Sequence, residues 1–85
     1  MATATPNDTP NPNAKKFALD VTLPEMFNIS SADDAGGNAF ATEVFAAGGV
    51  ASLFGVNDFV TVTRHPDADW DAIIAAVTTA ADAHL

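Results

Sequence analysis

Residues 50–64 read VASLFGVNDFVTVTR, and this stretch decides the fold because it encodes two strands joined by a tight turn. Both flanks are rich in β-branched and aromatic residues, and Asn57-Asp58 tolerates the positive φ angles of a two-residue hairpin loop. Such a loop places Leu53 opposite Val62, and Val60 then lies on their side of the sheet. We therefore expect this side to receive the helices and to form the core.

The opposite side of the hairpin is expected to carry Phe54, Val56 and Phe59 among hydroxyl side chains. Exposed aromatic residues grouped in this way are typical of a protein-binding surface. Two alternatives stay open: the start of the chain or a neighbouring strand covers these side chains, or a different turn length exchanges the two faces. Gly55 faces inward and leaves space for a bulky side chain, for which the candidates are Trp70 and Phe40.

Local signals elsewhere in the chain predict four further elements. Strands are expected at residues 15–21 and 26–30, a helix from about residue 38 to Gly48-Gly49, and an amphipathic helix that Asp67 or Asp69 caps. The element order is then β-β-α-β-β-α. The simplest architecture is an α+β two-layer sandwich, in which a mostly antiparallel four-stranded sheet carries two helices on one face.

The proline- and asparagine-rich start is expected to be a leader, with residues 1–14 flexible or extended and residues 15–85 forming a single domain. Prolines restrict their own backbone and push the preceding residue toward extended conformations. Lys15 and Lys16 follow, and they are two of only three Lys and Arg residues in the chain. They alternate across the first strand, where lysines either protect a sheet edge from aggregation or dock a partner.

Composition excludes several classes of protein. Eighty-five residues are enough for one domain. With 11 acidic and 3 basic residues the net charge is −8, which argues against nucleic-acid binding and against attraction to an anionic membrane surface. The opening MATATPNDTP has neither the basic start nor the apolar stretch of a signal peptide, so we expect a cytoplasmic protein.

Catalytic and metal-binding residues are not expected. The chain contains no cysteine, which excludes thiolate zinc sites, cysteine nucleophiles and cysteine-ligated clusters. Asp67, Asp69 and Asp71 resemble the start of a calcium loop, but the glycine and glutamate that such a loop needs further on are missing. His65 and His84 are too few for a metal site. No serine lies in a nucleophile-elbow pattern, so we do not expect an enzyme.

Three segments carry a resemblance to a known family: DTPNPNAKKF at 8–17, GGVASLFGVNDFVTVTR at 48–64 and DADWDAI at 67–73. Together, over roughly residues 8 to 84, the sequence resembles the N-terminal domain of NifU-like (Nfu-type) iron–sulfur cluster scaffold proteins. The sequence departs from the family at 38–41, where Asn-Ala-Phe-Ala replaces the usual Ser-Pro-Leu-Ala. It departs again at 54–55, where Phe-Gly replaces a pair of phenylalanines.

The resemblance implies a non-catalytic accessory domain of iron–sulfur cluster assembly that recognises a scaffold, carrier or client protein, with weak iron association left open. Full-length members hold the cluster through a Cys-x-x-Cys pair in a second domain. The 85 residues contain no such pair, so this chain alone is expected to bind no cofactor and to meet a cluster only through a partner. The candidate partner-binding residues are Phe54, Val56, Phe59, Lys15 and Lys16.

The alternative function is that of an adaptor for peptides or strands, unrelated to iron. Such an adaptor would use the same hairpin face or an open sheet edge, because an extended peptide can add a strand to an exposed edge.

Overall fold

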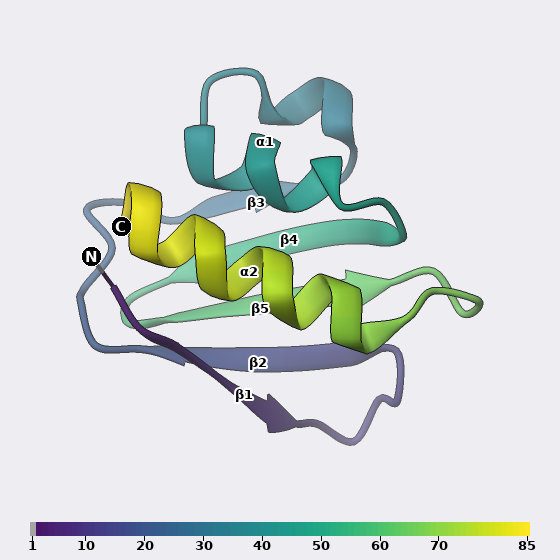
Figure 1. Cartoon of the computed structure of the whole chain (residues 1–85). Helices are drawn as coiled ribbons and strands as arrows, with labels where there is room; N and C mark the ends of the chain where they lie inside the picture. The colour runs from purple at the N-terminus through teal and green to yellow at the C-terminus, as the bar shows by residue number, and fades with distance from the viewer. Residues whose placement is uncertain (1) are drawn as a thin grey trace.

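One antiparallel sheet and two α-helices form the two layers of this computed structural model, which describes residues 2–85 and, for Ala32, the backbone alone. The strands are β1 (Ala4–Asp8), β2 (Ala14–Leu19), β3 (Phe27–Ile29), β4 (Val50–Val56) and β5 (Phe59–Arg64). The helices are α1 (Ala39–Ala46) and α2 (Trp70–His84), and a short 3-10 helix, η1, spans Ala32–Ala35. Figure 1 shows both α-helices on the same face of the sheet, which confirms the predicted α+β class.

The sheet has five strands, one more than expected, in the order β1-β2-β5-β4-β3. The additional strand is β1, which comes from the segment expected to be a leader and pairs antiparallel with β2, from Ala4 opposite Leu19 to Asp8 opposite Lys15. Pro6 lies within β1. Proline cannot donate a hydrogen bond to a ladder but is tolerated on an edge strand, so a proline-containing segment can still form this strand.

The β4–β5 hairpin has the predicted register. Val56 lies opposite Phe59 and Leu53 opposite Val62, and the only register shift recorded in this pair lies near Val50. Asn57 has a φ of 54°, the left-handed conformation that a tight hairpin turn requires and that asparagine tolerates. The prediction of which hairpin residues face the helices is therefore confirmed.

Both α-helices begin at a side-chain cap. The side chain of Asn38 accepts a hydrogen bond from the backbone N–H of Ala41 at 3.1 Å, so asparagine caps α1 at the point where the sequence departs from the family pattern. Asp69 accepts from the N–H of Asp71 at 3.0 Å and caps α2, which decides between the two predicted caps. Gly48 and Gly49 both have positive φ, as expected after the end of α1.

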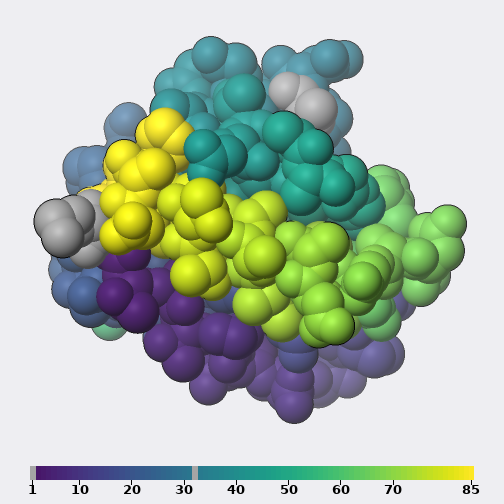
Figure 2. All heavy atoms as spheres, in the orientation of Figure 1, coloured from purple at the N-terminus to yellow at the C-terminus, as the bar shows by residue number. Residues whose placement is uncertain are grey.

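The core lies between the sheet and the helices, and its largest fully buried side chains are Phe17, Phe40, Leu53, Ile73, Val44, Val60, Val62 and Val77. In Figure 2 the spheres of α2 lie across this side of the molecule, between those of α1 and those of the N-terminal strand. The space above Gly55 is filled by Phe27 of the neighbouring strand β3, not by Trp70 or Phe40, because Phe27 lies directly opposite Gly55 in the ladder.

Candidate functional site

The side of the sheet that faces away from the helices is the candidate site, and we call it the open face. Side chains alternate along a strand, so the residues between the buried positions of the central strands point to this side. The open face consists of Lys16, Ala18, Asn28, Ser52, Phe54, Val56, Phe59, Thr61 and Thr63. In Figure 1 neither α-helix crosses this side of the sheet.

Three apolar side chains lie near the hairpin end of the open face. Phe54, Val56 and Phe59 are all half-buried, and none of them belongs to the core cluster or to the hydrophobic residues that pack against it. The ammonium group of Lys16 lies 4.2 Å from the ring centroid of Phe59, within the range of a cation–π contact. The structure therefore brings together four of the five predicted site residues, because β2 and β4 both pair with β5.

Met26 is exposed just before β3, and sequence analysis did not select it as a site residue. Among the described residues, it is the one large hydrophobic side chain that is exposed, with 60% of its surface accessible to solvent. Met26 precedes β3, whose first residue, Phe27, points inward onto Gly55. Met26 itself lies just outside the strand, one residue before the Phe27–Gly55 pair. The signal was present in the sequence, because Met26 alternates with the inward-facing residues of that strand.

The open face differs in charge from the rest of the molecule. None of the residues that define it is acidic, although the chain has 11 Asp and Glu residues. It carries Lys16, one of the three basic side chains. A partly apolar surface without carboxylates is the part of such an acidic protein that another protein can cover at the lowest electrostatic cost.

Lys15, the fifth predicted site residue, lies on the other side of the sheet. Its ammonium group is 5.4 Å from the ring centroid of Trp70 and 2.6 Å from Oδ1 of Asp8. The pKa of the Asp8 carboxyl lies below its usual value of 3.8. The main cause is the hydrogen bond from Lys15, and the positive charge of Lys15 adds to it. Lys15 therefore joins β1, β2 and the start of α2, and it does not contribute to the open face.

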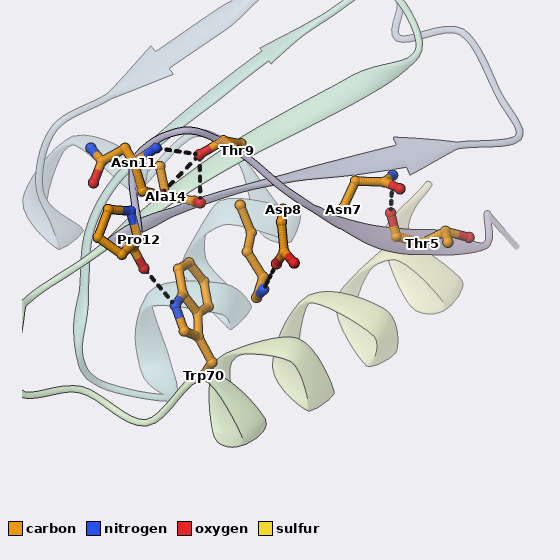
Figure 3. Close-up of polar contacts among 9 residues, drawn as sticks. Thr5, Asn7, Asp8, Thr9, Asn11, Pro12, Ala14 and Trp70 are labelled. Atoms are coloured by element: carbon orange, nitrogen blue, oxygen red, sulfur yellow. Dashed lines mark hydrogen bonds and ion pairs between the residues drawn. The ribbon is translucent and has the colours of Figure 1, made fainter.

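The turn between β1 and β2 is fixed by polar contacts, which Figure 3 shows together with Trp70. The hydroxyl of Thr9 lies 2.9 Å from the carbonyl oxygens of Asn11 and Ala14. The indole N–H of Trp70 donates to the carbonyl oxygen of Pro12 at 3.2 Å. The segment TPNPN thus anchors the turn to α2, which explains its composition in structural terms.

The two histidines lie apart. Nε2 of His84 is 3.2 Å from Oε1 of Glu43, beside a hollow of about 570 Å³ along α1. His65 is exposed after β5, where its backbone N–H donates to the carbonyl oxygen of Gly49. Within residues 2–85, no group of three or more His, Cys, Asp or Glu side chains is arranged to hold a metal ion. None of the helices formed by these residues combines the length and the apolarity needed to cross a bilayer.

These features define a small two-layer α+β domain with an open, partly aromatic sheet face. A family model described as "Scaffold protein Nfu/NifU N terminal" matches residues 5–85. The chain therefore belongs to the Nfu/NifU N-terminal family, as the sequence resemblance indicated, and membership of this family implies a role in iron–sulfur cluster assembly.

Solved structures show the same fold. The crystal structure of protein SAV1430 from Staphylococcus aureus superposes with a TM-score of 0.77 at 27% identity, covering 92% of this chain and 96% of that one. The solution structure of a NifU-like protein from Saccharomyces cerevisiae has the same fold, with a TM-score of 0.74 at 24% identity, covering 94% of this chain and 73% of that one. The comparison with curated proteins gave no match.

Proposed function

We propose that this domain is a non-catalytic interaction module of iron–sulfur cluster assembly and that its open face binds a scaffold, carrier or client protein. The observation that carries the proposal is the position of Phe54, Val56 and Phe59, which are half-buried on the sheet but do not pack against the core. Phenylalanine is among the residues that are enriched at protein interfaces relative to the rest of the protein surface.

A binding role without catalysis is consistent with the chemistry of the chain. It has no cysteine, the residue that supplies the thiolates of iron–sulfur clusters. We therefore propose that the cluster, wherever it is assembled, is held by the partner and not by this chain. We also propose that the protein is cytoplasmic and binds neither nucleic acid nor membranes. The net charge of −8 supports the second part, because nucleic acids and membrane surfaces are themselves anionic.

Capture of partners from an extract of the source organism at low ionic strength tests the proposal. We expect the immobilised chain to retain a protein of iron–sulfur cluster assembly, and Phe59→Ser to lose it. Phe45→Ser is the matched control, because Phe45 is also half-buried but packs against the core from α1. Circular dichroism of both variants checks that each is folded before its binding is compared with that of the native chain.

Retention of the same partner by Phe59→Ser would contradict the assignment of the open face. If the native chain instead captured only proteins unrelated to cluster assembly, the alternative of a peptide- or strand-binding adaptor would replace the proposal.

A further inference from the structure

Strand β1 contributes less apolar surface to the core than any other strand of the sheet. Of its five residues only Ala4 is buried, and Thr5, Pro6, Asn7 and Asp8 are exposed. The adjacent strand β2 buries Phe17 and Leu19, and the three-residue strand β3 still buries an isoleucine. Elements with little buried apolar surface open at low free energy, independently of global unfolding.

The contacts that hold β1 are those that any extended segment of similar chemistry could make. Its backbone pairs with β2 over residues 4–8, and its one ion pair joins Asp8 to Lys15. At its start, the N–H of Ala2 donates to the carbonyl of Ala81 in α2, and the N–H of Thr3 donates to the Asp20 carboxylate. Apart from the two small residues Ala2 and Ala4, these contacts are backbone bonds and surface charges.

The position that β1 occupies has the features of a binding site for an extended strand: an outer edge of β2, a neighbouring helix and a lysine. The outer edge of β2 offers its backbone groups once β1 departs. On one side α2 accepts the hydrogen bond from Ala2 at Ala81, and the two buried positions of the segment, Ala2 and Ala4, hold small side chains. Lys15 lies at the far end, on the face of Trp70, with its ammonium group directed toward the position of a carboxylate. The chain's own β1 shows which sequence the site accepts.

We propose that the β2 edge is a second binding site, which takes an extended segment of a partner protein in place of β1. The segment has small side chains at two alternate positions toward α2 and a carboxylate that reaches Lys15. Binding is strand addition to a sheet edge, in which main-chain hydrogen bonds give affinity and side-chain positions give specificity. This site is separate from the open face and does not depend on the function proposed for that face.

A labelled peptide with the sequence of residues 2–9, ATATPNDT, is the probe, and fluorescence anisotropy measures its binding to the full chain. In the native chain β1 competes with the peptide at an effective concentration on the order of millimolar, so binding is weak. Ala4→Asp places a carboxylate in the buried position of β1, so β1 docks poorly and we expect the peptide to bind at least about tenfold more tightly. Thr5→Asp is the matched control, because the same charge at the adjacent exposed position should leave binding unchanged.

A reversible disulfide between β1 and β2 provides a second test, which can be read even if Ala4→Asp fails to fold. Thr5 lies directly opposite Ala18, both are exposed, and the chain has no cysteine of its own. The double variant Thr5→Cys, Ala18→Cys should therefore form a cross-strand disulfide that holds β1 in place. We expect the oxidised form to lose peptide binding and the reduced form to regain it.

Equal binding of the peptide to the oxidised and reduced forms would overturn the proposal, as would unchanged binding to folded Ala4→Asp. Dimers in which two copies exchange β1 would identify a second copy as the occupant and would overturn the assignment to a foreign strand. All of these measurements use the chain and the peptide without the captured partner protein, so failure here is distinguishable from failure of the proposed function.

Discussion

At the scale of single residues, the contact between Gly55 and Phe27 shows how the sheet packs. A side chain at Gly55 would overlap the ring of Phe27, which itself lies 6.3 Å from Phe40, centroid to centroid. The sequence predicted that Gly55 admits a bulky group but not which one. Several aromatic residues could fill the space, and the choice depends on the pairing of β3 with β4, which no local signal determines.

Gly55→Ala is expected to destabilise the domain by roughly 1–3 kcal/mol, because the added methyl group forces the Phe27 ring from a packed position. Gly36→Ala is the control: its φ is −59°, and nothing lies within 4 Å of the added Cβ. Replacing glycine there should leave the free energy of unfolding unchanged or raise it by up to about 1 kcal/mol, because alanine restricts the unfolded chain. Urea denaturation measures both, and equal stability of the two variants would contradict this packing.

The ion pair between Asp8 and Lys15 makes a small, pH-dependent contribution to stability. The pKa of Asp8 is lowered by Lys15, so the contribution is fully present above the ordinary pKa of 3.8 and is lost as the pH falls through the depressed value. Asp8 is exposed, so solvent and salt screen the effect. NMR titration of the Asp8 carboxyl should give a lower pKa in the native chain than in Lys15→Met. Equal values in the two proteins would contradict the ion pair.

At the scale of elements, the sequence predicted what local chemistry determines. The hairpin register followed from the Asn57-Asp58 turn, and the start of α2 followed from the aspartates able to cap it. The start of α1 was expected near Asn38 because glycines precede it, and the structure shows that Asn38 itself is the cap. Strand β1 was not predicted because Pro6 and the prolines of the turn after it argue against a strand, although its partner β2 comes next along the chain. The division of Lys15 and Lys16 between the two faces was expected from alternation, but only the structure shows that Lys15 packs on Trp70.

The cap of α2 gives a direct test at this scale. Asp69→Ala should destabilise the domain by about 1 kcal/mol, because the N–H of Asp71 loses its acceptor at the helix start. Asp67→Ala removes the same charge two residues earlier, outside the cap, and should change stability by less than about 0.5 kcal/mol. Thermal unfolding of the two variants compares them, and a larger loss with Asp67→Ala would show that the cap is wrongly assigned.

At the scale of the whole molecule, the two faces of the sheet have different roles. One face is covered by α1 and α2 and forms the core, and the other carries a partly apolar group of side chains without carboxylates. Sequence reasoning found most of this group, because the hairpin register determines which residues share a face. It missed the exposed Met26, although in the sequence Met26 alternates with the inward-facing residues of β3.

The proposal that the partner holds the cluster predicts that the isolated chain stays colourless after anaerobic reconstitution with iron and sulfide. The chain offers no thiolate, and thiolates are the usual ligands of such clusters. Visible absorption spectroscopy on the desalted protein measures the outcome. A stoichiometric absorption band would show that the chain itself binds a cluster through other ligands.

The most direct measurement is chemical-shift mapping of the isotope-labelled chain on addition of the partner protein identified by capture from the extract. Binding through the open face predicts that the backbone amides of β4 and β5 around Phe54 and Phe59, and that of Lys16, shift or broaden, whereas those on the exposed side of α2 stay unchanged. Perturbations confined to α1 and α2, with the hairpin unaffected, would contradict the account.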